Sequence, residues 1–255
     1  MIHFPTPCIF AHRGASADAP ENTLPAFELA VQQGAHAIEL DAKLSKDGKI
    51  VVIHDRTLMR TTNGNGHVHK IDFAALRTLD AGSWFSSKYE NVRIPLLEEV
   101  LETIGRKIIV NIEVTNYRSP WDSLPEKIAE LVKRMKMTQH VMFSSFLPKN
   151  LRKLNSYLPG TPIALLTEPH IYGITQWTGI ARRTSPEIQH PYLTDVNQDV
   201  IEKAHERGIR LHTWTVNKEK DMKRLYQWGV DGIFTDHPAM AISLLSGNNA
   251  DNGDV

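Results

Sequence analysis

Short apolar runs recur along the chain, and most follow a segment whose apolar residues repeat every three or four positions. An apolar run bounded by glycine and polar residues is typical of a strand buried in a parallel sheet, whereas the three-to-four repeat is typical of an amphipathic helix. Leu24, Phe27 and Val31, for example, share one helical face, and Gly34 follows as a stop signal before the next run. Nine runs are strand candidates, namely 8–12, 37–41, 50–54, 108–113, 141–145, 162–166, 187–190, 209–214 and 232–235.

The alternation of these strands with helices and short loops predicts a parallel sheet covered by helices. The run at 187–190 is the weakest candidate because its residues are polar, and without it eight strands remain in the 255 residues. That number matches a TIM (β/α)8 barrel, which is the fold we expect. A doubly wound open sheet is the alternative, but no glycine-rich dinucleotide loop follows the first strand, where the chain has His12-Arg13-Gly14-Ala15.

One long segment interrupts the alternation. Between His54 and Leu97 the sequence is rich in turn residues and contains no clear strand. A connection of this length is usually functional or a small insertion. We therefore expect a single barrel domain over 1–245, with an insertion at about 55–96 after the third strand, and a disordered tail at 246–255 that is rich in Asn and Gly.

Charge and composition narrow the class of protein. Lys and Arg together number 29, as do Asp and Glu, so the formal net charge is zero and we expect no nucleic-acid partner. The single cysteine, Cys8, cannot form an intrachain disulfide, which fits a reducing compartment. The N-terminal residues do not resemble a signal peptide, and no apolar stretch reaches the roughly 18 residues that span a bilayer. The sequence therefore predicts a cytoplasmic protein without stable membrane association.

The candidate strands end in residues suited to metal and acid–base chemistry. In a TIM barrel the catalytic side chains come from the carboxyl ends of the strands, which share one rim. If the first three runs are parallel neighbours, their ends meet there. The residues at the strand ends are His12, Glu39, Asp41, His54, Glu113, Ser144, Ser145, Glu168, His190, Trp214 and Asp236.

Glu39 and Asp41 are two positions apart on one strand, so their side chains point to the same face. If that face is the barrel interior, Glu113 can join them from a neighbouring strand. Carboxylates this close repel one another, because one like-charge pair at about 4 Å costs roughly 4 kcal/mol at an effective dielectric near 20. Either the carboxyls hold protons or a cation lies among them, and oxygen ligands favour Ca²⁺ or Mg²⁺. Loop-capping or solvated carboxylates are the alternative.

Two histidines on the same rim indicate proton transfer. One imidazole of the pair His12 and His54 would accept a proton from the attacking hydroxyl, and the other would donate a proton to the leaving oxygen. Arg13 suits a phosphate oxygen because a guanidinium donates two parallel hydrogen bonds, although it could equally be a surface residue. With a cation that neutralises phosphoryl charge, these residues predict phosphoester cleavage. A zinc hydrolase with both histidines as ligands is an alternative.

A series of motifs follows in order from about residue 8 to residue 245. They are His12-Arg13-Gly14, Pro20-Glu21-Asn22-Thr23, Glu39-x-Asp41, His54-Asp55-x-x-Leu58-x-Arg60 with the residues to Gly66, Asn111-Ile112-Glu113, Ser144-Ser145-Phe146, Trp214-Thr215-Val216-Asn217 and 232–238. Together they resemble the glycerophosphodiester phosphodiesterase family. The runs Asp41-Ala42-Lys43-Leu44-Ser45-Lys46-Asp47-Gly48 and Asp80-Ala81-Gly82-Ser83-Trp84 further resemble its bacterial cytoplasmic branch.

This resemblance implies a TIM-barrel enzyme that hydrolyses glycerophosphodiesters to sn-glycerol 3-phosphate and an alcohol. It leaves open whether water or the glycerol hydroxyl attacks the phosphorus first. The residues that match functional positions of the family are His12 and His54 as general acid and base, Glu39, Asp41 and Glu113 as ligands of Ca²⁺ or Mg²⁺, and Arg13 as a phosphate contact.

The resemblance also implies that the stretch after His54 is the family's small insertion, which helps to shape the glycerol pocket. Trp214 is expected to line that pocket, with plain core packing as the alternative. One departure stands out, because the family commonly has Glu-x-Lys in the fourth strand, where the lysine helps to bind phosphate, and this chain has Thr115 there. Lys43, which shares strand parity with the carboxylates, is expected to compensate by binding substrate, and Arg118 is a second possibility.

Two other functions stay open at this point. A lysophospholipase D-type phosphodiesterase would act on a lipid substrate, but it needs an apolar mouth or an interfacial helix that no segment clearly supplies. A non-catalytic barrel would bind phosphodiesters or a partner protein, and its sequence signature would be the loss of a catalytic residue.

Overall fold

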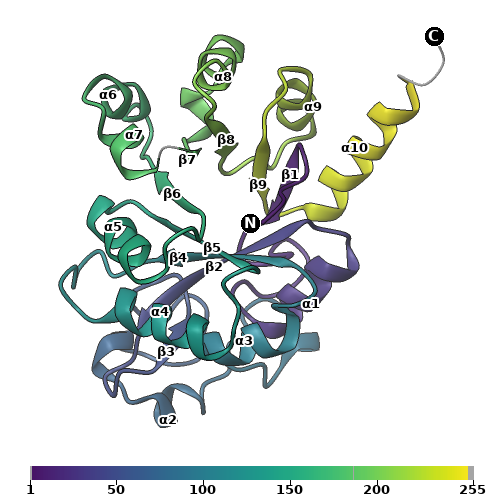
Figure 1. Ribbon diagram of the computed structural model, residues 1–255. Coiled ribbons are helices and arrows are strands. Elements are labelled where there is room, and N and C mark those ends of the chain that lie inside the picture. The colour runs from purple at the N-terminus through teal and green to yellow at the C-terminus, as the bar shows by residue number, and fades with distance from the viewer. Residues whose placement is uncertain (1, 186, 252–255) are drawn as a thin grey trace.

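The computed structural model describes residues 2–185 and 187–251. Its strands form one nine-stranded sheet, of which eight strands are parallel and close into a barrel because β1 pairs with both β2 and β9 (Figure 1). The predicted TIM barrel is confirmed. The strands are β1 (Cys8–Ala11), β2 (Ala37–Leu44), β3 (Ile50–Val52), β4 (Ile109–Val114), β5 (Val141–Ser145), β6 (Ile163–Leu166), β7 (Ile188–His190), β8 (Arg210–Thr213) and β9 (Gly232–Thr235).

Helices surround the strands on the outside (Figure 1). The first begins with Pro25 in its opening turn, and the chain leaves it through Gly34, whose φ of 78° is easy for glycine alone. The α-helices are α1 (Leu24–Gln32), α2 (Phe73–Leu76), α3 (Leu97–Ile104), α4 (Leu124–Arg134), α5 (Pro148–Tyr157), α6 (Tyr172–Trp177), α7 (Ile180–Thr184), α8 (Gln198–His205), α9 (Glu219–Gln227) and α10 (Pro238–Asp251); the 3-10 helices are η1 (Val68–Lys70), η2 (Ser87–Tyr89) and η3 (Leu193–Asp195).

Aromatic side chains fill the barrel interior. Phe10 and Phe234 stack with 4.5 Å between their ring centroids, and Phe4 packs against them from the N-terminal segment. A second apolar layer lies between the strands and the helices. The interior is therefore a packed core, as in other barrels of this class, and it supports a site at the strand ends.

The structure changes two strand assignments, that of 187–190, which was the weakest candidate, and that of 50–54. β7 is a true barrel strand that pairs with β6 and β8, and its polar Gln189 accepts a hydrogen bond from the Tyr172 hydroxyl. β3 lies outside the barrel and runs antiparallel to β2, so the expectation of three parallel neighbours is wrong. The reason is that an apolar run indicates burial and not direction. Val51 and Ile53 are buried by the apolar cluster of the following segment, whereas Val52 packs against the main core.

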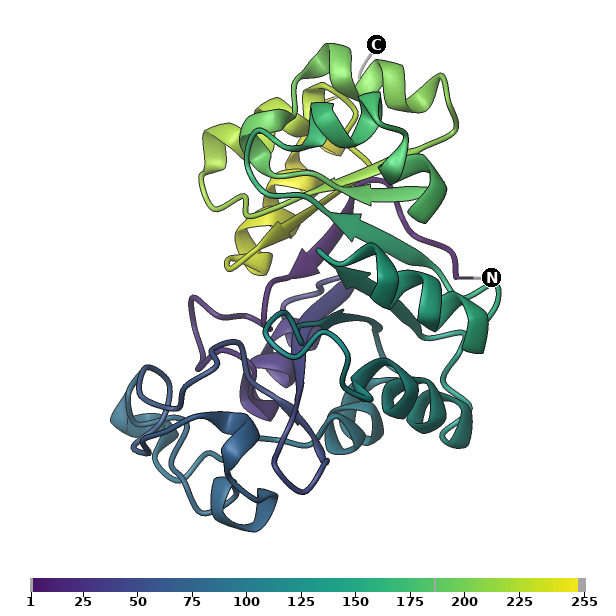
Figure 2. The ribbon, with the colours of Figure 1, turned by 90° about the vertical axis from the view of Figure 1, so that its left-hand side faces the viewer.

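The antiparallel pairing nevertheless returns the chain to the rim. The hairpin of β2 and β3 folds back on itself, and the Ile53 amide donates a hydrogen bond of 3.0 Å to the Asp41 carbonyl. His54 therefore follows directly beside the end of the barrel strand. The segment after it forms a lobe, with α2, η1 and η2, around a small apolar core that includes Leu58, Val68 and Leu76 (Figure 2).

The described C-terminal residues belong to α10. α10 continues to Asp251 and so enters the segment 246–255 that we expected to be disordered, while 252–255 lie outside the described residues. Among the residues that the structure describes, no helix is both long and apolar enough to cross a membrane.

Candidate active site

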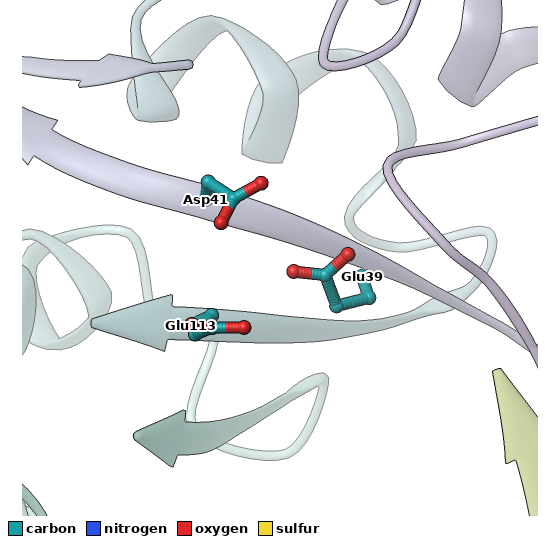
Figure 3. Close-up of side chains that lie close together, drawn as sticks. All are labelled: Glu39, Asp41 and Glu113. Atoms are coloured by element: carbon teal, nitrogen blue, oxygen red, sulfur yellow. The ribbon is translucent and has the colours of Figure 1, made fainter. Parts of the chain in front are cut away.

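The three predicted carboxylates meet at the rim of the barrel. Glu39 and Asp41 come from β2 and Glu113 from the neighbouring β4, and their side chains point toward one another (Figure 3). One oxygen of each lies within 4.8 Å of the others. The register explains this, because Asp41 stands opposite Glu113, and Glu39 stands opposite Asn111 two positions earlier on both strands. Glu39 and Asp41 are buried and Glu113 is half-buried.

The electrostatics of this carboxylate cluster are uneven. Burial raises the pKa of Glu39 and of Glu113, the Asp41 carboxylate raises both further, and the pKa of Glu113 reaches about 8. Burial acts on Asp41 in the same direction, but Arg13 in first place, with His54 and Lys43, outweighs it and holds the pKa of Asp41 below its ordinary value. An ionised aspartate therefore lies beside two glutamates that lack enough positive charge to ionise readily.

The donor atoms around the cluster fit a hard divalent cation. Asn111 is fully buried, and its Nδ2 donates to the Ser144 hydroxyl at 3.0 Å, but its Oδ1 has no hydrogen-bond partner among the described residues. Three carboxylates with an unpartnered amide oxygen beside them form the oxygen set that Ca²⁺ or Mg²⁺ prefers. Neither histidine belongs to this cluster, so it does not support the alternative of a zinc site with both histidines as ligands.

His12, at the end of β1, is held by a half-buried hydrogen bond to Asp236. Its Nδ1 lies 2.6 Å from Asp236 Oδ1, and Asp236 also accepts hydrogen bonds from Ser16 and Asn217. Burial alone would raise the pKa of Asp236, but these hydrogen bonds lower it to about 2. The carboxylate can only accept, so Nδ1 of His12 carries the proton and donates it, which leaves Nε2 available for proton transfer.

His54 has the same arrangement on the other side. Its Nδ1 donates to Asp55 Oδ1 at 2.7 Å, and Arg60 binds both oxygens of Asp55, at 2.9 and 3.0 Å. These hydrogen bonds, that of Arg60 above all, hold the pKa of Asp55 below its ordinary value. Arg60 also binds both oxygens of Glu21, at 2.6 and 2.8 Å, and Glu21 accepts from Arg13 at 2.9 Å. A continuous chain of ion pairs therefore connects His54 to the carboxylate cluster.

Arg13 lies at the end of that chain. Its backbone amide donates to Glu39 Oε2 at 3.0 Å, and its Nε lies 3.5 Å from Asp41 Oδ2. The residue adopts a φ of 58°, in the left-handed region that is strained for a side chain of this kind. Gly14 follows with a φ of 87°, and a Cβ there would lie 2.7 Å from the Ala26 backbone, so the tight turn requires glycine.

A cavity of about 600 Å³ joins these groups, and we call it the reaction cavity. Phe146 packs edge-on against Trp214 and forms an apolar wall, and the indole of Trp214 donates a hydrogen bond to the His190 carbonyl. Asp41 is within the carboxylate cluster but does not line the cavity. The lining residues are His12, Arg13, Glu39, His54, Asn111, Glu113, Tyr117, Arg118, Ser144, Phe146, Leu166, Glu168, Trp214 and Phe234.

A second cavity of about 640 Å³, the insertion cavity, lies beside the first. His54, Tyr117 and Arg118 line both cavities. Segments 55–57 and 67–70 of the insertion line the second cavity, whereas Trp214 lines only the first. The insertion and Trp214 therefore line two adjoining cavities.

Lys43 lines the insertion cavity. Its Nζ donates a hydrogen bond of 2.6 Å to Thr115 Oγ1, and it lies 3.4 Å from the Thr115 carbonyl oxygen. Burial lowers the pKa of Lys43, and the carboxylates of Asp41 and Glu113 act against this shift. Thr115, which stands where the family commonly has a lysine, thus binds the ammonium of Lys43.

Several residues of the site had no role assigned from the sequence. Asp55, Arg60 and Glu21 stand inside the motifs that suggested the family, and a carboxylate next to a candidate histidine was the available signal. Tyr117, whose hydroxyl donates to Glu113 Oε1 at 2.6 Å, stands outside those motifs. His190 ends β7 as predicted, and its side chain is fully buried in the barrel interior.

The comparisons with known proteins agree with this geometry. A sequence model of the Glycerophosphoryl diester phosphodiesterase family matches residues 12–240. The chain is 39% identical over 238 residues to a glycerophosphodiester phosphodiesterase of Caldanaerobacter subterraneus, covering 93% of this chain and 97% of that protein. It is 37% identical to a glycerophosphodiester phosphodiesterase of Bacillus subtilis, covering 93% of this chain and 86% of the relative.

Solved structures give the same relationship. The crystal structure of a glycerophosphodiester phosphodiesterase from Agrobacterium tumefaciens superposes with a TM-score of 0.81 at 30% identity, covering 92% of this chain and 99% of that one. A phosphodiesterase from Oleispira antarctica, determined in complex with the product sn-glycerol-3-phosphate, gives a TM-score of 0.83 at 29% identity, covering 94% and 97%.

Proposed function

Because the chain belongs to the glycerophosphoryl diester phosphodiesterase family, whose members are phosphoric diester hydrolases, we propose that it hydrolyses glycerophosphodiesters to sn-glycerol 3-phosphate and an alcohol. The observation that carries this proposal is the pair of histidines in one cavity, each oriented by an aspartate, beside a cluster of three carboxylates. The product bound to the Oleispira relative is consistent with it.

Glu39, Asp41 and Glu113 would hold a divalent cation, either Ca²⁺ or Mg²⁺. When bound, such an ion would neutralise charge on a phosphoryl oxygen and help to orient the nucleophile. The Tyr117 hydroxyl fixes one oxygen of Glu113, and Arg13 holds Glu39 through its backbone amide. These contacts leave few other orientations open to the two glutamates, as expected for residues that must present their oxygens to a common point.

His12 and His54 would share the proton transfers. Nδ1 of each histidine donates a hydrogen bond to an ionised aspartate, so Nε2 of each histidine is available to the reacting groups. One imidazole would take the proton of the attacking hydroxyl and the other, in its protonated form, would deliver a proton to the leaving oxygen. Each role is typically worth 10²–10⁴-fold in rate.

Positive charge for the phosphate would come from Arg13 and Lys43. Arg13 lines the reaction cavity next to the carboxylates. The ammonium of Lys43, which Thr115 holds, interacts electrostatically with Asp41 and Glu113. Trp214, on the apolar wall of the same cavity, would contact the carbon face of the glycerol. The presence of both histidines and all three carboxylates does not favour a non-catalytic barrel, and no feature of the reaction cavity favours a lipid substrate. A cytoplasmic location remains a prediction from the sequence.

The direct test of substrate class is a coupled assay for sn-glycerol 3-phosphate. The purified protein would be incubated with glycerophosphocholine, glycerophosphoethanolamine, glycerophosphoglycerol or a lysophospholipid, after chelation and re-addition of Ca²⁺, Mg²⁺, Mn²⁺ or Zn²⁺. We expect release from the water-soluble diesters that depends on Ca²⁺ or Mg²⁺. The lysophospholipid keeps its acyl chain when its headgroup is cleaved, so its hydrolysis is followed as lysophosphatidate and free alcohol. Hydrolysis of the lysophospholipid alone, or undiminished release of sn-glycerol 3-phosphate from the water-soluble diesters after chelation, would contradict the proposal.

A further inference from the structure

The insertion cavity has a strongly cationic wall. Its volume of about 640 Å³ exceeds what a small alcohol needs and lies within the range of ordinary ligand sites. The lysine and arginine side chains that line it come from β2, the insertion and the loop after β4, so they surround the space from different sides. They are Lys43, Arg56, Lys70 and Arg118.

The acidic residues of the same wall do not balance this charge. Asp55 is already bound by Arg60, and Asp122 Oδ1 accepts hydrogen bonds from the Asn116 side chain and the Leu124 amide. Within the described part of the chain, no side chain pairs with the guanidinium of Arg56. The same holds for the side chains of Lys70 and Arg118 in residues 2–185 and 187–251. The cavity therefore carries positive charge that lacks a counter-ion in the protein.

The insertion cavity adjoins the reaction cavity. His54, Tyr117 and Arg118 form the wall common to both, and the Tyr117 hydroxyl contacts Glu113 of the carboxylate cluster. A diester bound at the cluster has two substituents on its phosphorus. The side near Trp214 and Phe146 offers an apolar surface without lysine, which suits uncharged glycerol. The second substituent, the alcohol, is then directed into the insertion cavity.

We propose that the insertion cavity binds the alcohol part of the diester and selects alcohols that carry a further phosphate group. This rests on the proposed function. Arg56 and Arg118 can each donate paired hydrogen bonds to phosphate oxygens, and Lys70 adds a third exposed cation. A choline group would meet like charge in the same space and would be disfavoured.

The test compares two diesters that differ only in the added phosphate. Glycerophosphoinositol and glycerophosphoinositol 4-phosphate both release sn-glycerol 3-phosphate, so one assay serves for both. We expect kcat/KM to be about tenfold or more higher for the 4-phosphate at low salt, and the ratio to fall as ionic strength rises. Glycerophosphocholine should be the poorest substrate of the three.

Variants test whether the preference for the phosphorylated diester comes from the wall of the insertion cavity. The double variant Arg56→Ala/Lys70→Ala should bring the ratio of the two inositol diesters close to one. Lys88→Ala is the matched control, because Lys88 is an exposed lysine of the same insertion that lines neither cavity, and it should keep the wild-type ratio. Thermal melting of each variant verifies that the insertion is folded.

The outcomes separate the two proposals. If the wild-type ratio is near one, or if the double variant keeps the wild-type ratio, the cavity does not select phosphorylated alcohols while the proposed function stands. If no diester yields sn-glycerol 3-phosphate under any metal, both proposals are overturned.

Discussion

Lys43 Nζ donates a hydrogen bond of 2.6 Å to Thr115 Oγ1, across the pair of strands that carries the carboxylate cluster. The Thr115 hydroxyl donates its own proton to the Ala42 carbonyl at 2.7 Å, so only its lone pairs face the ammonium. The threonine therefore orients a lysine supplied by β2. This relationship gives a physical meaning to the sequence departure at position 115.

We predict that Thr115→Val raises KM for the diester about tenfold, because a hydrogen bond to a charged group is worth roughly 1.5–3 kcal/mol. Thr115→Ser, which keeps the hydroxyl, should behave like the wild type. Steady-state kinetics on one diester measure both variants.

The lysine and the threonine should also act as one unit. Lys43→Met removes the charge, and adding Thr115→Val to it should cost little more, as a double-mutant cycle would show. Independent, additive losses would show that Thr115 does not act through Lys43.

Much of the site follows from the sequence because strand parity is a local rule. Glu39 and Asp41 are two positions apart on a buried strand, so their side chains had to share a face. A parallel strand next to it was enough to bring Glu113 to the same face. The direction of the third strand did not follow, since apolar residues report burial from either side of a sheet. The link between Asp55 and Glu21 through an arginine depends on how the insertion folds, which no local pattern encodes.

Asp55→Asn should lower kcat by between a hundredfold and ten-thousandfold, roughly the range for loss of an oriented acid–base group. An amide in place of the carboxylate no longer fixes the proton on Nδ1 of His54, and it removes one of the two oxygens of residue 55 that accept hydrogen bonds from Arg60. Asp199→Asn, in an exposed pair with Lys203, is the control and should leave kcat unchanged. A normal kcat for Asp55→Asn would mean that the orientation of His54 is not needed.

Divalent cation should stabilise the fold as well as support activity. At a hundredfold excess over Kd, a ligand adds about 2.7 kcal/mol, which corresponds to a rise in Tm of roughly 5–10 °C for a chain of this size. Differential scanning fluorimetry of the chelated protein with added Ca²⁺ or Mg²⁺ measures this. Glu113→Gln should abolish the rise, whereas Glu98→Gln, in a surface pair with Arg134, should retain it. A rise that persists in Glu113→Gln would place the ion elsewhere.

The protein should become less stable as the pH is lowered into the acid range, because two histidines are buried in the barrel. His190 and His212 are fully buried, and their ring nitrogens have no hydrogen-bond partners among the described residues. Burial lowers the pKa of His190 to about 3 and lowers that of His212 as well. Below pH ~6.5 the unfolded chain takes up protons on these imidazoles while the folded chain does not, so the unfolding free energy decreases as the pH falls.

The expected slope is about 1.4 kcal/mol per pH unit for each such group across this window. Urea unfolding of His190→Leu between pH 6 and pH 4.5 should show a smaller slope than the wild type, whatever its absolute stability. An identical slope would mean that His190 titrates normally in the folded protein.

The central claim is that two oriented histidines beside the carboxylate cluster cleave the diester, and kcat for sn-glycerol 3-phosphate release tests it most directly. His12→Ala and His54→Ala should each lower kcat by at least about a hundredfold, with unchanged thermal unfolding. His3→Ala, an exposed histidine in the N-terminal segment, should have no effect. Near-normal turnover in both His12→Ala and His54→Ala would contradict the account.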